Sequence, residues 1–378
     1  MKKIHTINDY MEWRGDLRFT QDPFNEVDSV ILSMACFIDY QGIVPAPGVP
    51  GTVTFREAME QFDAMPEKDR HFGVIIPDET LDLARNASKC PRYSDAQLFA
   101  YENVVDEEKE MQFAAVTFRL SDRSLFVSFR GTDDTIVGWK EDFNMMFLSH
   151  IPAQERAAAY LNFVARQYPG DIRTSGHSKG GNLAIWSVVH ADSDVRRRVV
   201  RAYSNDGPGF NKEMLESAAY REMRDKCITF VPQSSLVGML MEHDENYQII
   251  QSDQTGLLQH DPFSWAVERN RYVYLEERSA FGEQSDAAIR LWLDSMTMEE
   301  KHSLVDDLFE VLESTGAKTL TDLSENKMKY AAVMYKTISG YDKARRKRIN
   351  RLMAQLITAR LEAALPENVT EKLEKWEN

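Results

Sequence analysis

The sequence predicts an α/β fold in which one buried sheet is flanked by helices, with a helical region before the sheet and a helical appendage after it. Apolar, β-branched runs alternate with helical patterns from Met111 to about Pro262, which is typical of strand and helix units around one sheet. The first hundred residues have mostly helical periodicity, and long helical patterns without strand signals follow Phe281. We therefore expect a domain over residues 1–280, with a helical part at 1–105, and a helical appendage over 281–378.

Composition sets limits on the partners of this chain. Its 378 residues are 43% hydrophobic and carry a net charge of -15. That length fits one domain of about 250 residues with an appendage. The acidic balance argues against binding to nucleic acids or to anionic membranes, since both require a basic surface.

The chain has no signal for export, for membrane insertion or for a cofactor. No apolar run approaches the roughly 18 residues of a membrane span, and the N-terminus lacks the apolar stretch of a signal peptide. Cys36, Cys90 and Cys227 lie far apart and have no metal-binding spacing, so we interpret them as thiols in a reducing cytoplasm. No His and Cys cluster has zinc spacing, and we expect no cofactor.

Ahead of the sheet, the pattern is helical from Tyr10 to about Asp39, and Gly42 to Gly51 is a loop rich in Pro and Gly. The next helix is expected at residues 54–65. There Thr54 and Glu57 have the spacing of a capping box, in which the two side chains bond each other's backbone amides.

The period then changes to that of strands. Residues 111–120 and 125–130 form a predicted hairpin around the turn at 121–124, and a helix is expected at 154–167. Further strand-like runs are 171–175, 199–204, 228–231, 247–252 and 257–262, with helices after residue 182 and at 212–224.

The appendage contains four helical patterns and one basic run, Lys343 to Arg348. We interpret the run as the solvated face of an amphipathic helix, and the alternative is a contact with a partner or a membrane surface. The appendage itself could cover the site or serve as an arm for homo-oligomerisation. Its expected helices are 287–295, 297–314, 326–338 and 343–365.

The strongest chemical motif is Gly176-His177-Ser178-Lys179-Gly180. It has the G-x-S-x-G pattern of a nucleophile elbow, a sharp turn between a strand and a helix that exposes a serine hydroxyl. Glycines on both sides let the turn close. An extended run precedes the motif and an apolar helix follows it, as the motif requires, so Ser178 is the candidate nucleophile.

A second motif, Phe129-Arg130-Gly131-Thr132 followed by Trp139 and Asp142, resembles the lipase class 3 branch of the α/β-hydrolases. The resemblance covers about Met111 to Pro262, and it is nearest to an uncharacterised bacterial subgroup with G-H-S-K-G-G at its elbow. It implies an α/β-hydrolase fold. It also implies an oxyanion hole in which Thr132 is the first donor, through its backbone N–H and its hydroxyl, and the backbone N–H of Lys179 is the second.

The general base is expected at His260. In this fold the chain order is nucleophile, acid and histidine, so the base should follow the last strand. Of eight histidines, His260 lies in that region, beside Pro262 and Trp265, and it matches the histidine of the resembled family. His177, inside the elbow, is expected to point away from the position of the base.

The acid departs from the resembled family. Class 3 lipases place an Asp after the strand at 228–231, where this chain has Ser235 and no carboxylate. Asp206, in a turn one strand earlier, is the candidate for orienting the imidazole, and Asp253 is next. The competing interpretations are that Asp206 only caps a helix near Asn211, or that Ser178 and His260 act as a dyad with Ser235 as a polar orienter.

The side chain of Lys179 has two possible roles. It could place a charge near an acidic group of the substrate, or it could be a surface residue on the first turn of the helix. We expect the surface position.

These residues predict a serine hydrolase that cleaves a carboxylic ester. By resemblance, the substrate is a small-molecule or lipid acyl compound. Two alternatives remain at this stage. One is a non-catalytic module of the same fold that binds a partner through its helical tail, and the other is an acyltransferase or thioesterase, which would share the first acyl-enzyme step.

Overall fold

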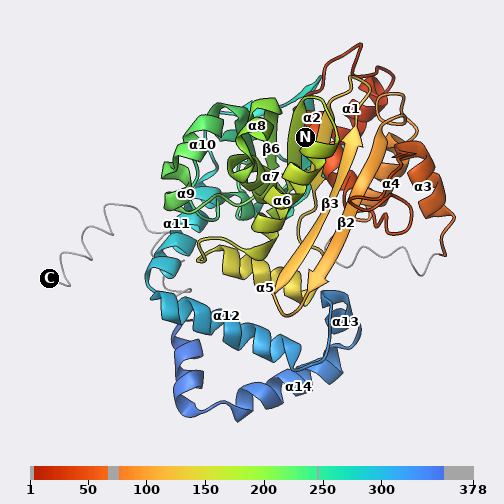
Figure 1. Cartoon of the computed structure of the whole chain (residues 1–378). Helices are drawn as coiled ribbons and strands as arrows, with labels where there is room; N and C mark the ends of the chain where they lie inside the picture. Colours follow the sequence, from red (N-terminus) through yellow and green to blue (C-terminus); the bar gives the residue numbers. More distant parts are fainter. Residues whose placement is uncertain (1–3, 67–75, 245–246, 353–378) are drawn as a thin grey trace. The chain divides into compact units, whose positions relative to one another are not determined.

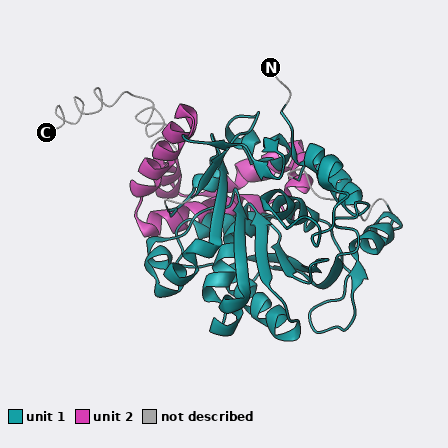
Figure 2. Ribbon diagram, turned by 90° about the horizontal axis from the view of Figure 1, so that it is seen from above, with its two compact units in different colours: residues 1–277 teal, residues 278–378 magenta. Residues whose placement is uncertain are grey.

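The computed structural model of the protein describes residues 4–66, 76–244 and 247–352 (Figure 1). The chain forms two compact units, Met1–Glu277 and Arg278–Asn378, which Figure 2 colours separately. The first unit contains the sheet. The second consists of helices and short connections where it is described.

A mixed nine-stranded sheet forms the centre of the first unit. Its order is β1-β2-β3-β4-β5-β6-β7-β8-β11, so neighbours in the sheet are almost always neighbours in the chain. The strands from β4 to β8 are parallel, and antiparallel strands flank them on both sides. The strands are β1 (Val53–Thr54), β2 (Gln97–Asp106), β3 (Met111–Arg119), β4 (Leu125–Phe129), β5 (Ile172–His177), β6 (Val199–Asn205), β7 (Cys227–Pro232), β8 (Gln248–Ile250) and β11 (Tyr274–Leu275), with a separate hairpin of β9 (Val267–Glu268) and β10 (Arg271–Tyr272).

The sheet is buried on both faces. In β4, Leu125, Val127 and Phe129 belong to one hydrophobic cluster and Phe126 to the other, because successive side chains of a strand point to opposite faces. All four are fully buried. The strands predicted at 111–120 and 125–130 therefore contribute side chains to two cores.

The two faces are covered by different parts of the chain. Parallel strands that follow one another in a single direction, joined by right-handed connections, place every connecting helix on the same face. Helices α6, α7 and α10 pack there, in one cluster, and α1 to α4 pack in the other. The helices of the unit are α1 (Ile7–Arg14), α2 (Glu26–Ala35), α3 (Phe55–Asp63), α4 (Glu79–Ala87), α5 (Ile136–Met145), α6 (Pro152–Gln167), α7 (Lys179–His190), α8 (Ser193–Arg198), α9 (Lys212–Glu216) and α10 (Ala218–Met223).

The α/β fold with a helical N-terminal region and a helical C-terminal appendage is confirmed, and the capping box at Thr54 and Glu57 forms as expected. The continuous helical pattern expected from Tyr10 to Asp39 is wrong. It is two helices, and α1 ends with Gly15 as its C-cap residue.

Three other expectations differ from the structure. Strand β2 lies within the part expected to be helical up to residue 105, and the helix expected at 212–224 divides into α9 and α10 at Ser217. The run at 257–262 is not a strand. A short 3-10 helix, Gly256–His260, occupies it, and β11 follows His260 in the chain, so His260 does not come after the last strand.

The second unit contains α11 (Ala280–Asp294), α12 (Met298–Glu313), α13 (Leu320–Glu325) and α14 (Lys327–Gly340), and residues 343–352 are also helical. The rest of the helix expected up to residue 365 lies outside the described residues. In the basic run, Arg345 and Arg348 pair with Asp307 of α12, whose side chain is 5% exposed. These two arginines therefore form ion pairs within the second unit.

No helix in the described parts of the chain combines the length and the hydropathy that a membrane crossing requires. The three cysteines are free thiols, and burial raises the pKa of the Cys36 thiol to about 11 and that of Cys227 to about 12. These thiols are therefore protonated at neutral pH and poorly nucleophilic.

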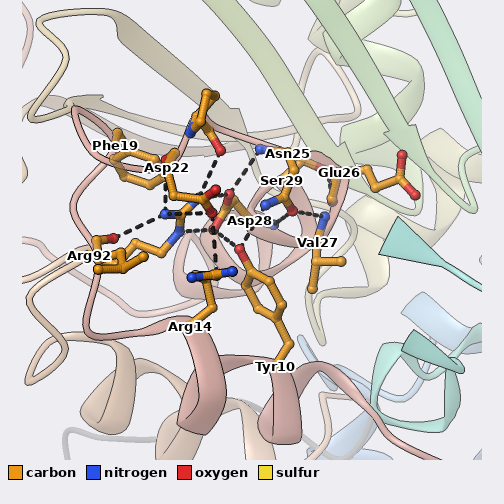
Figure 3. Close-up of polar contacts among 12 residues, drawn as sticks. Tyr10, Arg14, Phe19, Asp22, Asn25, Glu26, Val27, Asp28, Ser29 and Arg92 are labelled. Carbon is orange, nitrogen blue, oxygen red and sulfur yellow. Dashed lines mark hydrogen bonds and ion pairs between the residues drawn. The ribbon is translucent and has the colours of Figure 1, made fainter. Parts of the chain in front are cut away.

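A buried ion pair joins α2 to the segment between α4 and β2 (Figure 3). The Arg92 guanidinium donates to both carboxylate oxygens of Asp28, at 2.7 and 2.6 Å, and neither side chain is exposed. Its remaining N–H groups donate to the carbonyl oxygens of Leu17, Asp22 and Pro23. All five donors of the guanidinium are thus satisfied, and the segment between α1 and α2 is fixed around them.

We expect Arg92→Met to lower the free energy of unfolding by about 3–5 kcal/mol, because it leaves the Asp28 carboxylate buried without its counter-charge. Urea denaturation measures the change. Arg85→Met is the matched control. It breaks an ion pair with Asp63 whose side chains are 30% and 40% exposed, and such pairs contribute about 1 kcal/mol or less. Equal losses in the two variants would contradict the role assigned to the buried pair.

Candidate active site

The predicted site residues follow the carboxyl ends of neighbouring parallel strands. Thr132 comes after β4, Ser178 after β5, Asp206 after β6 and Ser235 after β7. Since the carboxyl ends of parallel strands meet at one edge of the sheet, these four turns share that edge, where open α/β sheets bind their ligands.

The turn at Ser178 has the backbone of a nucleophile elbow. Ser178 adopts φ 60° and ψ -133° between the end of β5 and the start of α7, a conformation that residues with a side chain rarely adopt. The surroundings explain how it is held. A Cβ at Gly176 would lie 2.1 Å from the carbonyl carbon of Gly180, and a Cβ at Gly180 would lie 2.1 Å from the carbonyl oxygen of Phe129. Glycine is required at both positions, as the motif predicts.

Asp206 and His260 are in direct contact. The imidazole Nδ1 lies 2.7 Å from Oδ2 of Asp206, a carboxylate with no exposed side-chain surface. The Nδ1–H donates to the carboxylate, which leaves Nε2 as the nitrogen that can accept a proton. The His260 side chain remains 26% exposed. The structure thus brings together the predicted acid and base. The alternative acid, Asp253, is exposed, and its backbone N–H donates to the carbonyl oxygen of Ser264.

Ser235 stands at the position where class 3 lipases have their Asp, and it hydrogen-bonds to Asp206. Its hydroxyl donates to Oδ1 of Asp206 at 2.6 Å and accepts the N–H of Gly238 at 3.0 Å. A Cβ at Gly238 would lie 2.0 Å from the same carboxylate oxygen. Asp206 therefore has one oxygen on the imidazole and one on Ser235. Its interpretation as a mere helix cap is wrong, because Asn211 caps α9.

His177 holds His260 from the elbow, which the sequence did not predict. Its Nε2 lies 2.7 Å from the carbonyl oxygen of His260, and the two rings lie 4.4 Å apart. Burial lowers the pKa of His177 well below its usual value. A neutral ring facing a carbonyl oxygen carries its proton on Nε2, so His177 donates to the main chain of His260.

The turn after β4 lies against the nucleophile. A Cβ at Gly131 would come within 3.2 Å of the Cβ of Ser178. Among the described residues, the backbone N–H groups of Thr132 and Lys179 have no hydrogen-bond acceptor. Free donors in turns beside a nucleophile are what an oxyanion hole consists of. The Thr132 hydroxyl is already used, because it donates to Oδ2 of Asp142 at 2.5 Å.

The Lys179 side chain is buried, and the expected surface position is wrong. It is 1% exposed and pairs with Glu141 of α5 at 2.9 Å. A buried ammonium needs a counter-charge and acceptors for its protons, and α5 and β3 supply them.

Asp142 has a perturbed carboxyl. Burial raises its pKa from the usual 3.8 to about 6, against the opposing effects of the Lys179 ammonium and the Thr132 hydroxyl. The Asp142 side chain is 28% exposed, and its ammonium neighbour lies 3.9 Å away. Within the ranges that the structure describes, no group of three His, Cys, Asp or Glu side chains is placed to hold a metal ion.

The mixed sheet flanked by helices, with the elbow at Ser178, defines a protein of the α/β-hydrolase-like fold. A sequence model of the Mbeg1-like family matches residues 87–310, more than half of the 378 residues. The chain belongs to the Mbeg1-like family. No curated protein matches it. Among solved structures, a crystal structure of M37 lipase is similar over 56% of this chain and 68% of that chain, at 11% identity and a TM-score of 0.34.

The raised pKa of Asp142 predicts a pH dependence of stability. A carboxyl whose pKa is higher in the folded state favours folding when protonated, and this contribution is lost as pH rises from about 4 to about 6. Relative to Asp142→Asn, the wild-type protein should therefore lose at most roughly 3 kcal/mol of unfolding free energy over that interval. Urea denaturation of both proteins between pH 4 and 7 measures the difference, and a difference that stays constant with pH would exclude the assignment.

Proposed function

We propose that the protein is a serine hydrolase that cleaves a carboxylic ester through an acyl-enzyme on Ser178. The observation that carries the proposal is the hydrogen bond between His260 and the buried Asp206, beside an elbow with the strained backbone of a nucleophilic serine. An imidazole that donates through Nδ1 to a carboxylate has the tautomer that a general base requires.

We assign the following roles to these residues. The Ser178 hydroxyl attacks the acyl carbonyl while Nε2 of His260 takes its proton, and Asp206 stabilises the imidazolium that forms. The N–H groups of Thr132 and Lys179 hold the oxyanion. His260 then gives the proton to the leaving alcohol. In the second half of the reaction, water gives a proton to His260 and attacks the acyl carbon. His260 returns the proton to Ser178, and the acid is released.

The lipase-like character of the family supports an acyl lipid or a related small ester as the substrate class. No step in this sequence requires a cofactor. We propose a cytoplasmic location, because free thiols are typical of a reducing compartment.

Fluorophosphonate labelling followed by intact mass tests the proposal. We expect one adduct on the wild-type protein, none on Ser178→Ala, and labelling at least about 10²-fold slower in His260→Ala and Asp206→Asn, since the loss of a triad partner costs several powers of ten in rate. Asp253→Asn is the matched control, because this exposed carboxylate should not affect labelling.

Two results would contradict the proposal. An adduct that persists in Ser178→Ala would place the nucleophile elsewhere. Labelling of a folded Asp206→Asn at the wild-type rate would show that Asp206 is not the acid of the site. Hydrolysis of p-nitrophenyl esters of increasing chain length, compared with Ser178→Ala, then gives the preferred acyl group.

A further inference from the structure

The most unusual buried group beside the nucleophile is the ammonium of Lys179. It donates to the carbonyl oxygen of Gln112 at 3.0 Å, to the side-chain oxygen of Gln112 at 2.7 Å and to Oε2 of Glu141 at 2.9 Å. Its three protons thus have three acceptors. The first residue of the elbow helix is fixed to β3 and to α5 through its own side chain.

Glu141 connects this contact to two further backbone segments. Its carboxylate also accepts the N–H of Gln112 at 3.1 Å and, on its other oxygen, the N–H of Ala153 at 2.9 Å. The side chain has no exposed surface. One buried ion pair therefore joins α7, β3, α5 and the start of α6.

Asp142 extends the contact to the turn after β4. It lies next to Glu141 on α5, 3.9 Å from the Lys179 ammonium, and it accepts the hydroxyl hydrogen of Thr132. Lys179 and Thr132 are the two residues whose backbone N–H groups we assign to the oxyanion hole. Their side chains meet on adjacent carboxylates of one helix.

A buried ion pair is costly to form, because both charges lose their hydration. Replacement of a buried ion pair by a hydrophobic pair is often neutral or stabilising, so stability alone does not account for this pair. A displacement of about 1 Å at a catalytic group costs about 10²-fold in rate, and two N–H donors on separate segments are open to such displacement.

We propose that Lys179 is a positioning residue for the oxyanion hole. Its ammonium, held by Gln112 and Glu141 and 3.9 Å from Asp142, fixes its own N–H and that of Thr132 relative to each other. This inference rests on the proposed function and adds to it the residues that fix the positions of its two oxyanion donors.

The charge state of Asp142 gives a readout that a merely structural role would not change. The charged groups facing Asp142 are Lys179, which lowers its pKa, and Glu141 and Asp133, which raise it. The effect of Lys179 is larger than that of Glu141. Removal of the ammonium should therefore move the protonation of Asp142 to higher pH, and the hydrogen bond to Thr132 would weaken with it.

The test is the rate of fluorophosphonate labelling of Ser178 from pH 5 to 9 in Lys179→Met and in the double variant Lys179→Met/Glu141→Gln. The double variant removes both charges of the Lys179–Glu141 pair, so neither partner is left buried alone, and it remains informative if the single variant does not fold. We expect labelling about 10²-fold slower at pH 8 and an acid limb displaced to higher pH. On an Asp142→Asn background the displacement should decrease or vanish.

Lys140→Met/Glu110→Gln is the matched control. It removes another ion pair between α5 and the start of β3, at 2.8 Å, and should label as the wild-type protein does. A folded Lys179→Met/Glu141→Gln with the wild-type rate and the wild-type acid limb would overturn the inference while leaving the proposed function intact. Absence of an adduct on the wild-type protein would overturn both.

Discussion

The site depends on backbone segments that approach one another more closely than any side chain would allow. A Cβ at Gly180 would lie 2.1 Å from the carbonyl oxygen of Phe129, and one at Gly207 would lie 2.7 Å from the carbonyl oxygen of Ser178. Glycine is the residue that permits such approaches. Because β4, β5 and β6 end within this contact, the turns that carry Thr132, Ser178 and Asp206 have little freedom relative to one another.

The proposed acid, Asp206, lies one strand earlier than in the resembled class 3 lipases. There the acid follows the strand that corresponds to β7, whereas Asp206 follows β6, the direct neighbour of β5, the strand that ends at Ser178. Ser235 occupies the vacated position and hydrogen-bonds the carboxylate. The structure distinguishes the two candidate acids, since Asp206 contacts His260 and the exposed Asp253 does not.

The sequence predicted the α/β-hydrolase fold and the turn at Asp206 because both depend on local patterns, namely strand runs and glycine turns. It selected His260 by expecting that residue after the last strand, although three short strands follow it. It missed β2, where Ala100 has φ 54° and a register shift between Phe99 and Glu102 interrupts the alternation. It also misplaced the Lys179 side chain. The partners of that ammonium lie 38 and 67 residues away in the chain, and no local pattern connects them.

The N-terminal helices cover a sheet face that the connecting helices leave open, and this determines how much of the chain can fold alone. Since the helices that connect the parallel strands all lie on one face, the opposite face of β3 and β4, with Val116, Phe118 and Phe126, is covered by α1 to α4. The match to the Mbeg1-like family begins at residue 87, where α4 ends. The smallest autonomous folding unit is therefore larger than the region of family likeness, and a fragment that starts at residue 87 would expose an aromatic sheet face and aggregate.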